Sequence, residues 1–243
     1  MNEVRVPMPR GEAVVRQFGN IQAAAAPIVL VFMDAFGPRP TLYEICERLA
    51  DSGYRVLLPD LFYMHAPYEP LSPANLFSGG DDRKRLMTML GGLDQASLDA
   101  DVGALLGFAE TLPGAAPIGA MGYCMGGRFA LTAASLSPRV RAAACFHSSA
   151  LAPESGDSAH TRLAGTKARV YVGTAGIDPT FDAAEAGRLA TALRQADIDH
   201  TLENYVGAMH GFVMDDLPAY NAAATARHWQ RLEALFAEAL ANS

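Results

Sequence analysis

The chain has 243 residues, of which 50% are hydrophobic and 19% are charged, and it contains 22 glycines and 15 prolines. This composition is typical of a compact globular protein with many turns, and it excludes a largely disordered chain. The formal net charge of −7 argues against nucleic acid as a partner, because neutralising phosphates requires clustered Lys and Arg.

Targeting and cofactor signals are missing from the sequence. The N-terminal segment has no continuous apolar stretch of the kind found in secretory signals, and no later segment approaches the roughly 18 to 20 apolar residues that span a bilayer. Three cysteines are too few and too far apart for a disulfide framework, and no Cys or His spacing suggests a metal site. We therefore expect a cytoplasmic protein that needs no membrane, metal or cofactor.

Apolar runs of strand length recur along the chain, mostly without the polar alternation of a half-exposed sheet, which is typical of buried, largely parallel strands. The expected strands are Ile28–Met33, Tyr54–Leu58, Ile118–Tyr123, Arg141–His147, Val170–Thr174 and Thr201–Val206.

Helical patterns lie between several of these strands. Apolar residues recur at three- and four-residue spacings around 42–49 and 98–109, and again in a last helix at about 218–241. Alternating strands and helices predict an α/β fold with a doubly wound sheet. No repeat or break in composition divides the chain, so residues 1–243 are expected to form one domain. The region 60–92 is expected to supply a loop or cap over the carboxyl ends of the strands, where α/β proteins bind ligands, and its stretch 60–81 is the least regular part of the chain.

One glycine-rich turn carries the chemistry. Gly122-Tyr-Cys124-Met-Gly126 joins an apolar strand to an apparent helix and has the Gly-x-nucleophile-x-Gly form of a nucleophile elbow. Flanking glycines avoid steric overlap at the sharp turn, and the helix N-terminus favours a thiolate. The alternatives are a turn with a packing cysteine and a dinucleotide-binding loop, but the Gly-x-Gly-x-x-Gly spacing is absent. Cys46 and Cys145 lie in apolar segments and are interpreted as core residues.

A thiol nucleophile needs a base, and His210 is the favoured candidate. It follows the expected strand Thr201–Val206 in the segment Gly207-Ala-Met-His-Gly-Phe212. A histidine in a loop is commonly only solvated, so the prediction depends on the elbow and on chain order. His147, at the end of an expected strand, is the main competitor.

Asp178 completes a candidate catalytic triad. It lies in Gly176-Ile-Asp-Pro179, the expected turn at the carboxyl end of the strand Arg169–Ala175, where a carboxylate can orient an imidazole. Such an aspartate commonly caps the next helix, but Asp182 can do this instead and leave Asp178 free. The order Cys124, Asp178, His210 is the order of α/β-hydrolase triads.

With these segments the chain resembles the dienelactone hydrolase family over about residues 12–236. The motifs are Met33-Asp-Ala-Phe-Gly37, Tyr54-Arg-Val-Leu-Leu-Pro-Asp-Leu-Phe62, the elbow, Gly173 to Asp178, and Gly207 to Phe212. The resemblance implies an α/β-hydrolase fold and assigns the triad to Cys124, Asp178 and His210.

The resemblance also implies roles around the nucleophile. The family has an acidic residue, usually Glu, at the position of Asp34, where it can interact with the resting thiol. The next residue, Ala35, is implied to donate its N–H to the oxyanion hole, and elbow geometry adds the N–H of Met125. Further candidates for substrate binding are Phe36, Tyr63 and Arg83.

Two features bear on the substrate. The family holds a substrate carboxylate with two arginines, and Arg83 or Arg85 can supply the first, although a solvated charge run explains them equally well. The second falls near Met214, where no cation is available, so a two-arginine clamp is not expected.

These observations together predict a carboxylic ester hydrolase that cleaves a small-molecule ester or lactone through an acyl-enzyme. The alternatives are a catalytically silent ligand-binding protein of the same fold and a thioesterase- or amidotransferase-like cysteine enzyme. The amidotransferase class requires a Glu two residues after its histidine, where this chain has Phe212. The sequence does not indicate an oligomeric state.

Overall fold

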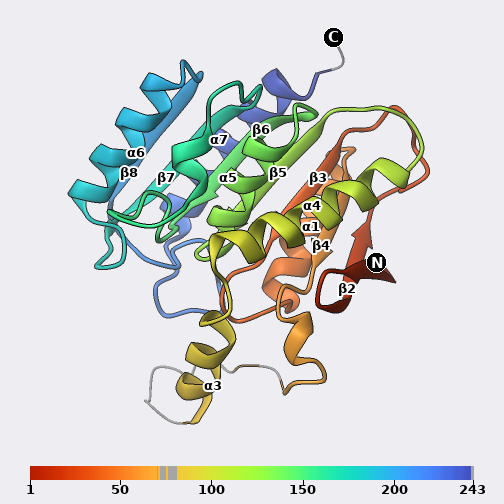
Figure 1. Cartoon of the computed structure of the whole chain (residues 1–243), viewed down its shortest axis with the longest axis horizontal. Coiled ribbons are helices and arrows are strands. Elements are labelled where there is room, and N and C mark those ends of the chain that lie inside the picture. Colours follow the sequence, from red (N-terminus) through yellow and green to blue (C-terminus); the bar gives the residue numbers. More distant parts are fainter. Residues whose placement is uncertain (70, 72–74, 76–80, 242–243) are drawn as a thin grey trace.

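A computed structural model describes every residue except 70, 72–74, 76–80 and 242–243. Its centre is an eight-stranded sheet with the order β1-β2-β4-β3-β5-β6-β7-β8. The six strands from β4 to β8 are parallel to one another, and β2 pairs antiparallel with β4. This is the α/β-hydrolase architecture that the sequence predicts (Figure 1).

All six expected strands are present. Every residue of the strands β3, β4 and β5 is buried, which explains their unbroken apolar sequences. The last two strands run farther toward their carboxyl ends than predicted. The observed bounds are β3 Ile28–Phe32, β4 Arg55–Pro59, β5 Ile118–Tyr123, β6 Val140–Phe146, β7 Arg169–Ile177 and β8 His200–Met209.

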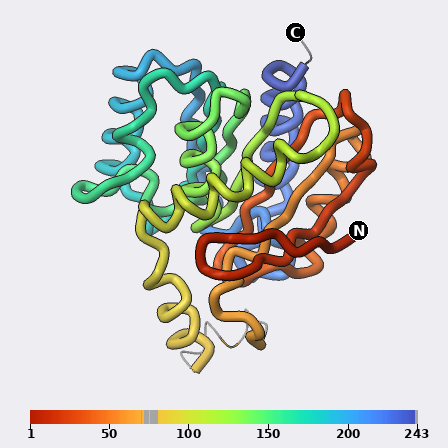
Figure 2. The backbone as a smooth tube through the Cα atoms, turned by 45° about the vertical axis from the view of Figure 1, so that its right-hand side comes forward, coloured from red at the N-terminus to blue at the C-terminus, as the bar shows by residue number. Residues whose placement is uncertain are grey.

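The N-terminal hairpin is a feature that the sequence analysis did not predict. Its strands are β1 (Asn2–Met8) and β2 (Gly11–Phe18), which pair antiparallel and extend the sheet. The hairpin lies at the outer side of the sheet, near the helix α4 (Gln95–Thr111) (Figure 2). An ion pair of 2.8 Å joins Arg10 in its turn to the buried Asp101 of this helix.

Helices cover both faces of the sheet. The helices α4, α5 (Gly126–Leu136) and α6 (Ala183–Gln195) lie on the near face in Figure 1. On the other face, α1 (Pro40–Asp51) and α7 (Ala222–Ala239) are joined by an Arg48–Glu233 ion pair of 2.7 Å. With these bounds, α7 is shorter than the last helix predicted at about 218–241.

The expected loop or cap region, 60–92, includes helical segments among its described residues. A short 3-10 helix, η1, spans Tyr63–His65. The helix α3 spans Asp81–Leu90 and lies beyond the ends of the strands (Figure 1). The helix thus follows the stretch expected to be least regular, 60–81. Part of the region falls on residues 70, 72–74 and 76–80, outside the described residues.

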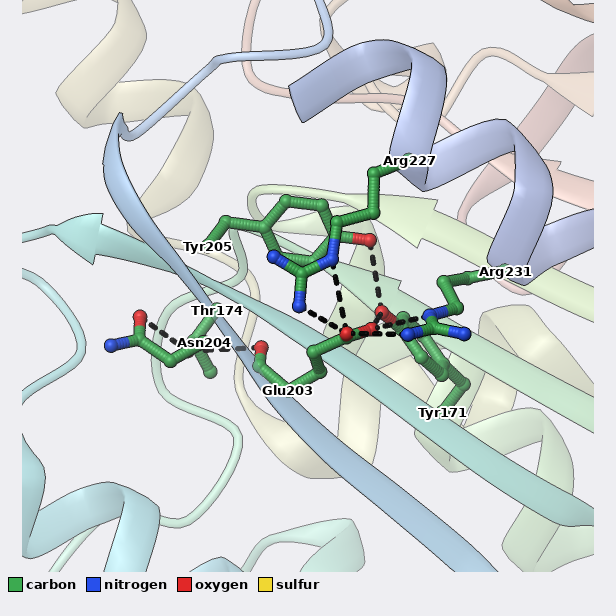
Figure 3. Close-up of polar contacts among 7 residues, drawn as sticks. All are labelled: Tyr171, Thr174, Glu203, Asn204, Tyr205, Arg227 and Arg231. Carbon is green, nitrogen blue, oxygen red and sulfur yellow. Dashed lines mark hydrogen bonds and ion pairs between the residues drawn. The ribbon is translucent and has the colours of Figure 1, made fainter. Parts of the chain in front are cut away.

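Hydrogen bonds from Arg227 and Arg231 on α7 to Glu203 connect this helix to the edge strand β8. Glu203 on β8 accepts hydrogen bonds of 2.9 Å from both Nε and one terminal nitrogen of Arg231. Arg227 also donates to Glu203, with its Nε at 3.0 Å, and its guanidinium lies 4.8 Å from the ring centre of Tyr205. Figure 3 shows both arginines reaching from the helix to this carboxylate. These contacts hold the last helix against the end of the sheet.

Two general findings complete the description. None of the helices in the described residues is long and apolar enough to cross a membrane. Within the same part of the chain, no group of His, Cys, Asp and Glu side chains is arranged to hold a metal ion.

Candidate active site

Cys124 stands at a strained turn between β5 and α5. Its φ is 53°, in the left-handed region that non-glycine residues rarely adopt. A Cβ on Gly122 would lie 2.0 Å from the carbonyl oxygen of Gly126, and a Cβ on Gly126 would lie 2.3 Å from the carbonyl oxygen of Phe32. Both contacts are with backbone, so only glycine fits at the positions two residues before and two residues after the cysteine. This geometry is that of a nucleophile elbow, and Cys124 remains partly exposed.

His210 and Asp178 meet at the carboxyl ends of neighbouring strands. Asp178 directly follows β7 and His210 directly follows β8. The Nδ1 atom of His210 lies 2.7 Å from Oδ2 of Asp178, and the other carboxylate oxygen accepts from both the backbone and the hydroxyl of Thr180, at 2.9 and 2.6 Å. Asp182 caps α6 through the N–H of Glu185, as predicted, and leaves Asp178 available for His210.

The charges around His210 favour its protonated form. Burial lowers the pKa of His210, but hydrogen bonds with Asp178 and the Cys124 thiol outweigh this and raise it to about 10. Burial also acts to raise the pKa of Asp178, yet the hydrogen bonds from His210 and Thr180 lower it overall. The three side chains therefore form one connected set in which Asp178 is an anion and His210 can hold a proton beside the thiol.

The two amides expected in the oxyanion hole flank the elbow. Met125 is the residue before α5, and Ala35 lies two residues after Met33, whose carbonyl oxygen packs 2.6 Å from the Cβ position of Gly126. In the part of the chain that the structure describes, neither amide donates a hydrogen bond to another protein group. Both residues are buried, at 7% exposure each.

Asp34 is held by an arginine that the sequence analysis did not single out. Arg39 donates to both carboxylate oxygens of Asp34, at 2.6 and 2.9 Å, and also to both oxygens of Asp216, at 2.5 and 3.1 Å. Burial raises the pKa of Asp34 although the guanidinium of Arg39 opposes this. The cluster of two aspartates and one arginine carries one net negative charge, and any contact of Asp34 with the thiol must compete with Arg39.

The substrate-binding candidates have different surroundings. Phe36 is half-buried, and the guanidinium of Arg39 lies 5.2 Å from its ring centre. Tyr63 is buried and its hydroxyl donates to Asp101 at 2.7 Å, so its polar end faces α4. Arg83 is exposed on α3.

The alternative cationic candidate, Arg85, forms hydrogen bonds with other residues of the region 60–92. It donates to Asp82 and to the carbonyl oxygen of Glu69, both at 2.7 Å.

The other cysteines are packing residues, as predicted. Cys46 is fully buried, and burial raises its pKa well above the usual value. Cys145 is also fully buried, burial raises its pKa to about 12, and its thiol donates to the carbonyl oxygen of Gly127 at 3.3 Å. Neither thiol is exposed for nucleophilic attack.

Comparisons with known proteins bear on the family and the fold of the chain. The model of the dienelactone hydrolase family matches residues 16–240. The chain belongs to this family. It is 29% identical over 217 residues to a protein of Synechocystis named "Putative carboxymethylenebutenolidase", covering 86% of this chain and 85% of that protein. It is 30% identical over 120 residues to carboxymethylenebutenolidase 1 of Cupriavidus pinatubonensis, covering 49% of this chain and 50% of that one.

Solved structures give the same fold. The chain superposes on the crystal structure of a "Putative Dienelactone Hydrolase" from Klebsiella pneumoniae with a TM-score of 0.79, 22% identity and 97% coverage of both chains. This likeness shows the fold, while the family match shows that the chain belongs to a hydrolase family.

Proposed function

We propose that this member of the dienelactone hydrolase family hydrolyses small carboxylic esters or lactones, with Cys124 as nucleophile, His210 as acid and base, and Asp178 as the carboxylate that orients His210. The observation that carries the proposal is the 2.7 Å contact between His210 Nδ1 and Asp178 Oδ2, together with the interaction of the same imidazole with the Cys124 thiol. The named relatives supply the reaction class.

The reaction begins from the pair of Cys124 thiolate and protonated His210, which forms when the thiol gives its proton to the imidazole. The thiolate attacks the acyl carbon, and the N–H groups of Ala35 and Met125 stabilise the oxyanion. Collapse of the tetrahedral intermediate breaks the carbon–oxygen bond of the ester, and the leaving alkoxide takes the proton from His210. In the second half His210 removes a proton from water, whose oxygen attacks the thioester and regenerates the Cys124 thiol.

Asp178 makes this cycle possible through charge. Each half-reaction places a positive charge on His210, and a neighbouring carboxylate stabilises that charge. The two hydrogen bonds from Thr180 hold the carboxylate in a single orientation, so that its second oxygen faces Nδ1.

A cysteine series tests the proposal. Cys124→Ala should abolish turnover of activated esters and lactones, while Cys46→Ala and Cys145→Ala should retain turnover and lose about 1 kcal/mol of folding stability, because each removes only a small buried group. A folded Cys124→Ala protein that keeps the wild-type rate would overturn the proposal. If the wild type turns over no ester and Cys124 resists alkylation, the silent binding protein becomes the better interpretation.

A further inference from the structure

A second histidine, His147, packs against the ring of His210. His147 follows β6, is 1% exposed, and its ring centre lies 5.2 Å from that of His210 at an interplanar angle of 64°. Phe212 contacts the same ring edge-to-face at 5.4 Å, and Tyr123 stacks on it at 5.6 Å. His147 is therefore enclosed by aromatic rings on the side of His210 that faces the core.

The ring of His147 is polar but lacks polar partners. Neither Nδ1 nor Nε2 has a hydrogen-bond partner among the described residues, although both atoms are buried. A buried polar group in this state costs roughly 1 to 3 kcal/mol, and an apolar ring would avoid the cost. The backbone is also unusual, because His147 has a φ of 38° and is held by its N–H, which donates to the carbonyl oxygen of Gly173 at 2.8 Å. Packing alone does not explain an imidazole at this position.

His147 stays neutral beside a histidine that gains charge. Burial, together with the nearby His210 and His228 and the more distant Arg39, holds the pKa of His147 well below its usual value. A neutral imidazole has one N–H and one lone-pair nitrogen, and it can exchange them between its two ring positions. It can therefore turn electron density toward a positive neighbour without taking the proton itself.

We propose that His147 is a positioning residue for His210, and that its neutral ring stabilises the imidazolium form of His210 through its unpaired nitrogens. This inference rests on the proposed function, because it concerns the charge that His210 carries during catalysis. The other charged or titratable groups that act on His210 are Asp178 and Cys124. Asp178 supports the same charge from the Nδ1 side, while His147 contacts the ring plane or edge.

The neighbouring His228 does not compete for this role. Its Nε2 atom lies 3.0 Å from the hydroxyl of Tyr123, and burial lowers its pKa to about 3. Its ring packs on Phe146 and Trp229, with ring centres 4.2 and 5.0 Å apart, and not on His210. His228→Phe is thus a matched control, since it also replaces a buried neutral histidine in the same aromatic cluster.

The test is the pH dependence of Cys124 alkylation by iodoacetate. This anion reacts fastest while the thiolate is paired with a protonated His210, so the rate falls when His210 loses its proton. In His147→Phe, which keeps a ring but removes both nitrogens, the falling limb should move about one pH unit lower, the scale of a lost polar contact to a charged group. His147→Gln restores a polar group and should keep the limb near its wild-type position. His228→Phe should leave the limb unchanged.

Two results would overturn the proposal. One is a falling limb in folded His147→Phe that matches the wild type. The other is a limb in His147→Gln that moves as far as expected for the Phe variant, and this result decides the matter if His147→Phe does not fold. Because alkylation needs no substrate, these outcomes are separate from whether the enzyme hydrolyses esters.

Discussion

Replacing Gly126 by alanine should damage the elbow and the oxyanion hole together. The new Cβ would lie 2.3 Å from the carbonyl oxygen of Phe32 and 2.6 Å from that of Met33, and contacts below 3.0 Å are essentially never seen. The end of β3 or the start of α5 must therefore move by about 0.7 Å, since both partners are backbone and cannot rotate away. Ala35, two residues after Met33, would move with this segment.

The expected magnitudes follow from that displacement. Misplacing a catalytic donor by about 1 Å costs on the order of 100-fold in rate, and overpacking of this kind lowers the free energy of unfolding by about 1 to 3 kcal/mol. Gly103→Ala is the matched control, because the Cβ position of Gly103 on α4 has no heavy atom within 4 Å. Alanine there should raise stability by up to about 1 kcal/mol and leave activity unchanged.

The assay combines ester turnover with urea unfolding of the wild type and both variants. A Gly126→Ala protein with wild-type turnover and stability would refute the steric reasoning. So would equal losses in Gly126→Ala and Gly103→Ala, because the damage would then not depend on the contact with β3.

Three other predictions concern charge. Burial acts to raise the pKa of Glu203, but hydrogen bonds from Arg231, Tyr171 and Arg227 lower it to about 2 instead of 4.5, so its stabilisation is complete above about pH 5 and is lost as the pH falls toward 2. After allowance for solvent screening, Glu203→Gln should cost about 1 to 2 kcal/mol in unfolding experiments at pH 7 and nothing near pH 2, whereas a pH-independent difference would contradict this. Asp34→Asn removes the net negative charge of the cluster with Arg39, so thiolate formation at Cys124, measured by its alkylation rate, should begin about half a pH unit lower. An unchanged pH profile of alkylation would exclude a gating role for Asp34. With Met214 in place of a second cation, kcat/KM should differ by less than about 100-fold between a carboxylate-bearing lactone and its neutral analogue, and a several-thousandfold preference for the acid would show a complete clamp.

The parts of this fold that the sequence predicts are those with strong local signals. The buried parallel strands are unbroken apolar runs, and the elbow glycines are required by close backbone contacts at Gly122 and Gly126. Chain order then places Asp178 and His210 after neighbouring strands, where the structure brings them to 2.7 Å. The hairpin β1–β2 was missed because β1 is at the sheet edge and exposes most of its residues, so it has no comparable apolar run.

The missed site features depend on contacts between distant segments. Arg39 stands five residues after Asp34, but its second partner, Asp216, is 177 residues away in sequence. The sequence analysis considered His147 only as a competing base, and its ring contact with His210 arises because β6, β7 and β8 are consecutive neighbours in the sheet. No local pattern marks His147, whereas an arginine five residues after an acidic residue implied at the site is a signal that could have found Arg39.

The central claim is that Cys124 forms a covalent acyl-enzyme with help from His210 and Asp178. The most direct measurement is intact-mass analysis of the protein quenched within its first turnovers of 4-nitrophenyl acetate, followed by peptide mapping. We predict a single added acetyl group on the peptide containing Cys124, its absence in Cys124→Ala, and its much slower appearance in His210→Ala. An acetyl group on another residue, or hydrolysis at the wild-type rate by Cys124→Ala, would contradict the account.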